Sequence, residues 1–299
     1  MRTQFVNLPK LTSSILFLVL LVGICTASYG QTTFGSILGT VVDSSGSTVL
    51  GASVTVRAID TGDTRHATTN TAGEYVLTHL NPGRYEVSVE HPGFKRFVRQ
   101  SIYLQTDGQL RVDATMEVGD VSSSVTVTEN VAPIETETGR IGVIQSQTLY
   151  QYAPVAANRG AFNQFVLAPG TLVTAQSTYS INGSRGYSNG YAIDGTSTRT
   201  PTNGAQESSQ SPWIDYLQES RIDSVNNSAE FAHAGNFNMT TKSGTNELHG
   251  AAEYIYQGSA VSARSFFVAK KAFSLYHAYA GTIGGPIVIP HLYDGRNRT

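Results

Sequence analysis

The side chains that most often carry chemistry form no known constellation in this chain of 299 residues. Its seven histidines include no His-Glu-x-x-His pair and no close spacing with cysteine, which are the patterns that hold zinc. Gly46 and Gly51 have the spacing of a phosphate-binding loop, but Ala52 stands where such a loop needs lysine. We therefore expect no metal site and no phosphate-bound cofactor.

The carboxylates and the net charge also give no indication of catalysis or of nucleic-acid binding. The pairs Asp60/Asp63 and Glu135/Glu137 stand in turns or linkers, where a carboxylate is normally solvated. The formal net charge is -2, and no basic run is interleaved with aromatic residues as in nucleic-acid-binding proteins. The sequence predicts a protein that is not an enzyme, has no cofactor and binds no nucleic acid.

The first thirty residues are typical of an export signal. Arg2 and Lys10 give a positive start, residues 15–24 form an apolar core too short to span a bilayer, and small residues precede Gln31. Cleavage after Ala27 is an alternative. Ile24 precedes the lone Cys25, where a lipoprotein signal needs a small residue, so we expect export by a cleaved signal peptide without lipidation.

Beyond the signal, residues 32–118 alternate between apolar and polar side chains, with a turn every eight to twelve residues. This pattern predicts an all-β sandwich of roughly seven strands. Gly73 and Gly83 are suited to turns with positive φ, and Pro82 presets the bend before Gly83. The alternating apolar positions are Ile37, Val41, Val54, Val56, Ala58, Tyr75, Leu77, Tyr85, Val87, Val89, Ile102, Leu104, Leu110, Val112, Ala114 and Met116.

Two stretches of this region resemble the carboxypeptidase regulatory-like domain. They are GTVVDSSGSTVLGASVTV at 39–56 and TNTAGEYVLTHLNPGRYEVSVEHPGF at 69–94. The resemblance implies a non-catalytic accessory domain, and some related sandwiches bind starch-like sugars. Such binding would need an exposed aromatic platform, whereas Tyr75 and Tyr85 are in phase with the core positions.

A turn-rich stretch, TTKSGTNELHG at 240–250, separates this β-rich region from a different pattern. After it, Ala252, Tyr254 and Tyr256 alternate with Glu253, Ile255 and Gln257, as in strands of a membrane β-barrel, although soluble sheets alternate too. Together with SAEF at 228–231, TKSGTNELHG resembles the plug-to-barrel junction of TonB-dependent outer-membrane receptors. The Oar-like subfamily, which carries an additional N-terminal β-domain, is the most similar.

The region between sandwich and junction resembles the plug of these receptors. Its most helix-like piece is 161–167, flanked by NRG at 158–160 and LAPG at 167–170. In YSINGSRGYSNGYAIDGTS at 179–197, Arg185-Gly186 and Asp194-Gly195 match an Arg-Gly and Asp-Gly motif on the central sheet of plugs. The resemblance implies that Arg185 pairs with a carboxylate inside the barrel, and a solvated arginine is the alternative. Asp194-Gly195 itself predicts a tight turn after an apolar strand.

The segment DVSSSVTVTE at 120–129 resembles the TonB box, which pairs with an energy-transducing protein in the periplasm. Main-chain hydrogen bonds carry this kind of strand addition, and β-branched residues favour the extended conformation that it needs. The alternative is an ordinary last strand or a linker. The candidate TonB box consists of Ser124, Val125, Thr126, Val127 and Thr128.

We therefore expect a mainly β chain: a β-sandwich, a mixed α+β plug, and the first strands of an outer-membrane barrel. Since such a plugged barrel has about 22 strands, residues 246–299 supply only its start, which suggests an N-terminal fragment of a receptor. The expected parts are a signal peptide (1–30), the sandwich (32–118), a linker with the TonB box (119–140), the plug (141–245) and the truncated barrel (246–299).

The expected function is energy-coupled uptake of a large solute, such as an oligosaccharide, a peptide or a metal chelate. The expected partners are a TonB-type protein and outer-membrane lipid, and the sandwich is expected in the periplasm. The alternative is a secreted or surface β-sandwich module that binds carbohydrate or protein. The sequence does not identify the solute, because the barrel loops that would select it are not in this chain.

Overall fold

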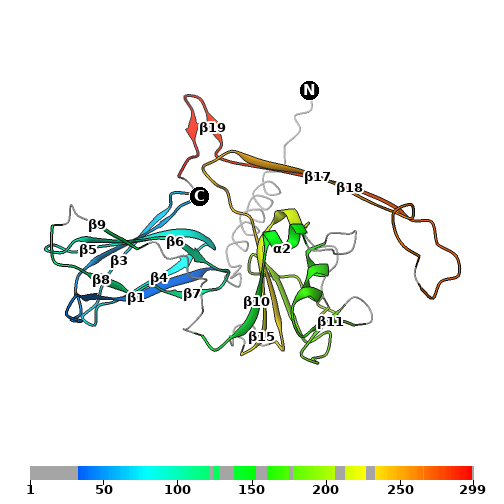
Figure 1. Cartoon of the computed structure of the whole chain (residues 1–299), viewed down its shortest axis with the longest axis horizontal. Helices are drawn as coiled ribbons and strands as arrows, with labels where there is room; N and C mark the ends of the chain where they lie inside the picture. The colour runs from blue at the N-terminus through cyan, green and yellow to red at the C-terminus, as the bar shows by residue number, and fades with distance from the viewer. Residues whose placement is uncertain are drawn as a thin grey trace, which may run out of the picture. The chain divides into compact units, whose positions relative to one another are not determined.

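The computed structural model describes residues 33–120, 124–127, 138–152, 160–174, 178–205, 213–226, 233–264 and 266–297. The predicted signal peptide and Thr128 lie outside these residues, and nothing in the structure bears on them. The described part is built mainly of strands with a few short helices (Figure 1). None of its helices has the length and apolar character needed to cross a bilayer.

The first domain is a sandwich of two sheets, and one of them is organised around β1 (Gly35–Asp43). β1 pairs antiparallel with β4 (Glu74–Leu80) on one side. On the other side it pairs in parallel with β7 (Gln109–Arg111) and then with β8 (Ala114–Met116). This sheet is therefore complete only when its last strand, β8, pairs with its first strand, β1.

The second sheet has five strands in the order β3-β2-β5-β6-β9. Neighbours are antiparallel except β6 and β9, which are parallel. The strands are β2 (Ser53–Ala58), β3 (Thr64–Thr68), β5 (Gly83–Glu90), β6 (Arg96–Leu104) and β9 (Ser124–Val127).

One hydrophobic core closes between the two sheets. Because side chains alternate along a strand, every second residue of β1 and β2 points inward, and Ile37, Val41, Val54 and Val56 are fully buried. Tyr75 is also buried, and its hydroxyl donates to the carbonyl of Val112 at 2.7 Å. Burying a Val or Ile side chain contributes roughly 1.5–3 kcal/mol, so this core is the main stabilising element of the domain.

The predicted sandwich is confirmed, with differences in detail. In the described part of the chain the two sheets hold nine strands, eight of them within residues 32–118 where roughly seven were expected. The short β3 was not expected, because Ala67 is its only apolar residue and none of its residues is fully buried. Gly73 and Gly83 have φ angles of 73° and 153°, as expected for these turns. Tyr85 is a core residue like Tyr75, so neither offers an exposed platform for a sugar.

A second sheet domain follows, which we call the middle domain (residues 138–241). Its five-stranded sheet has the order β10-β15-β16-β13-β14. A separate hairpin, β11 and β12, and the short helices α2, η1 and η4 complete it. The bounds are β10 (Ile141–Ser146), α2 (Gln147–Tyr152), η1 (Ala161–Leu167), β11 (Thr171–Val173), β12 (Tyr179–Ile181), β13 (Gly190–Ile193), β14 (Thr196–Ser197), η4 (Ile214–Tyr216), β15 (Leu217–Val225) and β16 (Asn236–Thr241).

An aromatic cluster holds η1 against this sheet. Phe165 stacks on Phe237 with ring centroids 4.2 Å apart, and Tyr191 stacks on the same ring at 5.0 Å. Phe162 and Tyr179 meet these rings edge-on or tilted. The helical piece expected at 161–167 is therefore present as a 3-10 helix, with its apolar face in the core. The apolar run that precedes β15 is core as expected, since Ile214, Leu217 and Ile222 are buried.

The chain then forms a long two-stranded ribbon, β17 (His249–Gly258) and β18 (Leu275–Gly284) (Figure 1). The two strands stay in antiparallel register over their full length. A short hairpin of β19 (Val288–Ile289) and β20 (Tyr293–Asp294) follows.

Candidate functional site

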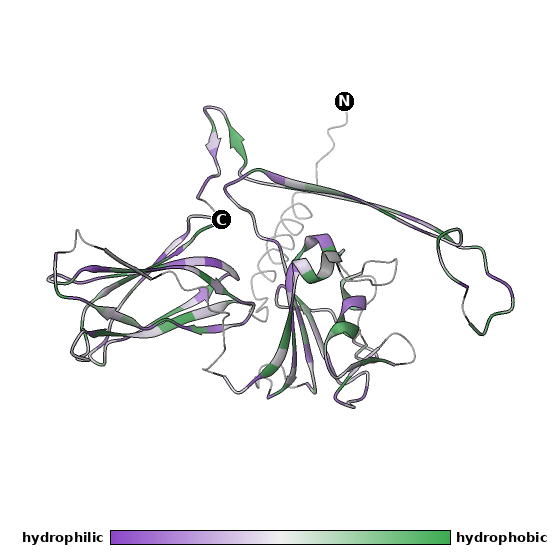
Figure 2. Ribbon diagram, in the orientation of Figure 1, coloured by the Kyte–Doolittle hydropathy of each residue, from purple (hydrophilic) through white to green (hydrophobic). Residues whose placement is uncertain are grey.

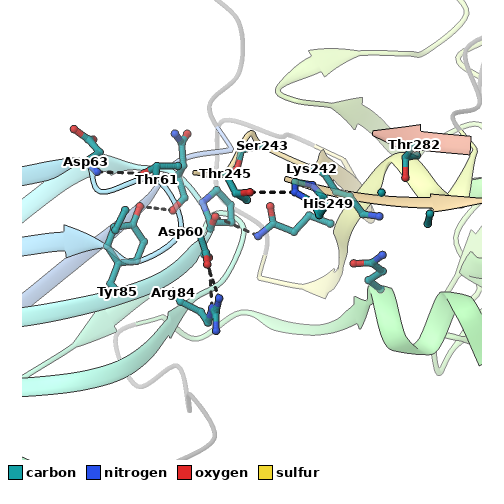
Figure 3. Close-up of a pocket in the computed structure, with 18 residues that line it drawn as sticks. Asp60, Thr61, Asp63, Arg84, Tyr85, Lys242, Ser243, Thr245, His249 and Thr282 are labelled. Atoms are coloured by element: carbon teal, nitrogen blue, oxygen red, sulfur yellow. Dashed lines mark hydrogen bonds and ion pairs between the residues drawn. The ribbon is translucent and has the colours of Figure 1, made fainter. Parts of the chain in front are cut away.

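The junction stretch between β16 and β17 lines a cavity of about 410 Å³, shown in Figure 3. Lys242, Ser243 and Thr245 enter it from the junction. The sandwich contributes Asp60, from the turn after β2, and Arg84, from the start of β5. The cavity thus combines residues that are far apart in the sequence, and its walls carry both signs of charge.

The sandwich side of the cavity is fixed by an ion pair and by main-chain contacts. The guanidinium of Arg84 lies 2.5 Å from a carboxylate oxygen of Asp60, and this hydrogen bond raises the pKa of Arg84. The backbone N–H of Asn246 donates to the Asp60 carbonyl at 3.0 Å, and its side-chain amide donates to the Thr61 carbonyl at 2.7 Å. Asn246 therefore ties the junction to the sandwich loop.

Lys242 is the distinctive charge of the junction. Its backbone N–H donates to the Tyr216 carbonyl at 2.8 Å, which fixes the main chain of Lys242 beside the cavity that the residue lines. Partial burial lowers the pKa of its ammonium, while the negative charge of Asp215 acts in the opposite direction. Such a cation suits a carboxylate or another polar acceptor, so the cavity is equipped to bind polar groups.

One further spacing in the sequence resembles a catalytic motif. Residues 186–190 read GYSNG, the Gly-x-Ser-x-Gly pattern of a nucleophile elbow. In the structure Ser188 lies in the loop between two strands, whereas an elbow needs a strand-to-helix turn. Its hydroxyl donates to the Arg185 carbonyl at 2.6 Å, so the hydroxyl is engaged in closing that loop.

The Asp194-Gly195 pair forms the two-residue turn between β13 and β14. Both residues have positive φ, 46° and 77°, which is the conformation of a tight type I′ hairpin. The Asp194 carboxylate accepts the backbone N–H of Thr241 at 2.9 Å and its hydroxyl at 2.7 Å. The predicted turn is confirmed, and it fixes the end of β16, directly before the junction.

Arg185-Gly186 occupies a different position from the one implied by the resemblance. The pair lies in the connection between β12 and β13, not within the central sheet, and the Arg185 side chain is exposed. No ion pair of Arg185 exists among the described residues. Gly186 packs closely, since a Cβ there would lie 2.4 Å from the Thr178 hydroxyl. A pairing of Arg185 with a barrel carboxylate stays a prediction.

The structure places four of the five residues of the candidate TonB box in β9. Ser124–Val127 pair in parallel with Arg96, Phe97, Val98 and Arg99 of β6. β9 is the edge strand of the sheet, and its second edge has no partner among the described strands. The segment is therefore extended and paired as an edge strand of the sandwich, which agrees with the alternative of an ordinary last strand. Its role as a TonB box stays a prediction.

The ribbon of β17 and β18 has two unlike faces. Cross-strand partners share a face, so Tyr254 lies opposite Tyr279 with ring centroids 5.0 Å apart. This face also carries Ile283 and Leu275, all of them exposed. The opposite face carries Glu253, Gln257 and Thr282 together with the partly buried Ile255 and Tyr276 and with small residues. One apolar, aromatic face and one mixed polar face are typical of a transmembrane β-hairpin.

A buried carboxylate was not identified from the sequence. Glu219 on β15 is almost fully buried and accepts hydrogen bonds from the backbone N–H of Thr106 and, at 2.9 Å, from the Tyr103 hydroxyl. Arg221 and Asp223 form a buried ion pair at 2.8 Å on the same strand. The sequence does show Glu219, Arg221 and Asp223 at alternate positions, which indicates that they share one face of a strand. Whether that face is buried depends on the sheets around it.

Two family models match this chain. Residues 36–117 match the carboxypeptidase regulatory-like domain, and residues 240–299 match an outer membrane beta barrel domain. Over 236 residues the chain is 30% identical to the TonB-dependent transporter Oar of Myxococcus xanthus. This match covers 75% of the chain and 22% of the relative, so the chain spans about a fifth of that protein's length.

Similarity to solved structures is confined to parts of the chain. The TIE protein of Bacillus anthracis matches 29% of this chain and 17% of its own, with 21% identity and a TM-score of 0.26. A carbohydrate binding protein from Bacteroides uniformis, described as putative, matches 27% of this chain and 40% of its own, with 23% identity and a TM-score of 0.24. These scores carry no inference about function.

Proposed function

We propose that this chain, a homologue of the TonB-dependent transporter Oar, is the N-terminal part of an outer-membrane receptor that takes up a large solute with energy supplied through TonB. The solute class is an oligosaccharide, a peptide or a metal chelate. The sandwich lies in the periplasm after removal of residues 1–30. The partners are a TonB-type energy-transducing protein and the lipid of the outer membrane.

The observation that carries this proposal is the two-faced ribbon of β17 and β18. Each strand has 10 residues, and a transmembrane β-strand has about 9–11. Exposed Tyr254, Tyr279 and Ile283 would be costly in water but are favoured against lipid. The match of residues 240–299 to an outer membrane beta barrel domain covers this same ribbon.

The remaining parts then have a defined order. Residues 141–245 are the plug, whose last strand, β16, leads directly into the barrel start at residues 246–299. Asp194 supports this transition because its carboxylate holds Thr241 at the end of β16. The cavity beside Lys242 lies along the same junction, so a movement of the plug relative to the first barrel strand would change the shape of this cavity.

Energy coupling is assigned to residues 119–140, with the TonB box at Ser124–Thr128. A TonB-type protein would add a strand of its own sheet to β9, either at the free edge of β9 or after β9 separates from β6. Main-chain hydrogen bonds provide the affinity in strand addition, so the sequence of the box matters less than its ability to stay extended. The accessible edge position of β9 supports this assignment.

A binding and crosslinking experiment tests the proposal. Val127→Pro removes a backbone donor from β9 and should abolish binding of the purified periplasmic domain of a TonB-type protein. Thr126→Val is the matched control, because a β-branched residue with an intact N–H should keep the binding. Val125→Cys should form a disulfide with a cysteine placed in the interacting strand of that domain.

In cells that produce the complete gene product, the protein should fractionate with the outer membrane. Val127→Pro should leave it there while energy-dependent uptake is lost, because membrane insertion and coupling use different segments. If the protein is recovered as a soluble secreted product, the alternative of a β-sandwich binding module replaces the receptor. If Val127→Pro keeps full TonB binding, the box lies elsewhere.

A further inference from the structure

The connection between β17 and β18, residues 259–274, carries a dense group of exposed aromatic residues. Phe266, Phe267 and Phe273 are 85%, 94% and 84% exposed. Phe266 and Phe267 meet edge-on with ring centroids 5.1 Å apart. Soluble surfaces rarely expose several large apolar side chains so close together, and such groups mark contacts with a protein or a membrane.

The same connection has a strong positive charge. Arg264, Lys270 and Lys271 are exposed, and no aspartate or glutamate stands between Glu253 and Asp294 in the sequence. The whole chain has a formal net charge of -2, so this local excess of cations is opposite in sign to the chain as a whole. Figure 2 shows strongly hydrophobic and strongly hydrophilic residues side by side in this connection.

The hydrogen bonds inside the connection determine which cations face outward. Arg264 donates to the Val268 carbonyl, and Lys271 donates to the Ser262 carbonyl, so both help to fold the connection on itself. Lys270 makes no such bond among the described residues and leaves its ammonium in solvent. Aromatic residues and cations therefore share one short segment, the pattern of an interfacial anchor.

The position of the connection follows from the ribbon, and this step depends on the proposed function. If β17 and β18 span the hydrocarbon core, the connection starts where the strands leave it, since Ser259 donates to the Ser274 carbonyl directly after the last strand residues. At this level, transmembrane barrels carry girdles of aromatic residues. Long connections between barrel strands lie on the outer side of the membrane.

We propose that residues 259–264 and 266–274 form an anchor for phosphate-bearing anionic lipid, with the ammonium of Lys270 on the headgroup phosphates. The three phenylalanines enter the boundary between headgroups and acyl chains. The occupant is a lipid surface because the segment combines apolar side chains with cations and lacks carboxylates.

Vesicle co-flotation of the full chain tests the anchor. We expect tighter binding to vesicles that contain phosphatidylglycerol than to vesicles of phosphatidylcholine alone, and added salt should remove the difference. Lys270→Gln should weaken binding to the anionic vesicles about 5-fold, since each lysine at an anionic surface contributes roughly 1 kcal/mol. Phe266→Ser/Phe267→Ser should weaken binding to both kinds of vesicle.

Arg57→Gln is the matched control, because it removes one exposed positive charge from the sandwich and leaves the connection intact. The proposal is overturned if this control loses the preference for anionic vesicles as strongly as the lysine variant. It is also overturned if the lysine variant keeps the preference, or if the chain binds neither vesicle. TonB binding by the same variants separates the two proposals, since loss of the anchor leaves β9 unaffected.

Discussion

Asp194 links a turn to the end of the neighbouring strand β16. Its replacement should show how much this link contributes to the free energy of unfolding. Asp194→Ala removes both hydrogen bonds to Thr241 and puts alanine at a φ of 46°. We expect a loss of about 2 kcal/mol in the free energy of unfolding, measured by urea denaturation. Asp194→Asn should lose less than half as much, because asparagine tolerates this φ and keeps one acceptor. Equal losses would contradict this account, because they would show that neither the retained acceptor nor the tolerance of asparagine for this φ contributes to stability.

Glycine is needed for different reasons at two turns of the sandwich. Gly73 has a φ of 73°, and a Cβ there would lie 2.6 Å from the Val41 carbonyl oxygen. Gly46 has a similar φ of 86° but open space around the Cβ position. Gly46→Ala should therefore cost about 1 kcal/mol, and Gly73→Ala clearly more, in thermal unfolding of the chain. A larger effect at Gly46 would contradict this account.

At the scale of single residues, local patterns identified the turns and the core. Asp194-Gly195, Gly73 and the inward phase of Tyr75 could be predicted because each depends on neighbours within a few positions. The buried Glu219 could not be predicted, since its partners Tyr103 and Thr106 stand in a distant part of the sequence. Lys242 belonged to a recognised stretch, but the cavity beside it exists only once sandwich and junction have folded.

Among the strands, β9 should be the one that opens most readily in its sheet. β5 is paired on both sides, whereas β9 is paired only with β6. Backbone amides of β9 should exchange with deuterium much faster than those of β5, because edge strands open without disturbing the core. If β9 is as protected as β5, strand addition by a TonB-type protein would need its free edge, since separation from β6 would be too rare.

The strands that sequence patterns found are those with one buried face. β1 alternates regularly between buried and partly exposed residues along its length. β3 has no buried residue, so its pairing with β2 through the main chain left no hydrophobic signal. The helical piece at 161–167 was visible from its flanking glycine and proline, but whether it is an α-helix or a 3-10 helix depends on how it packs against Phe237.

For the whole molecule, the clearest expectation concerns the independence of the sandwich. Every residue of its core lies between Ile37 and Met116, and none comes from the middle domain. A fragment of residues 33–118 should therefore unfold in one cooperative thermal transition with a β-type circular dichroism spectrum. A fragment of residues 33–105 should show no cooperative transition, because it lacks β7 and β8. Cooperative unfolding of the shorter fragment would refute this view of the core.

The pairing of β1 with β8 also determines the order of folding steps in a chain that crosses a membrane from its N-terminus. Val41 is paired with Ala114, so the sheet around β1 is complete only after β8 has crossed the membrane. Until then β1 is paired with β4 alone, and the core around Ile37 and Val41 lacks Val112, Ala114 and Met116. Contacts between residues this far apart in the sequence form slowly. During this interval the emerging segment would depend on a chaperone, and the sandwich would be complete before the Tyr-rich ribbon follows it.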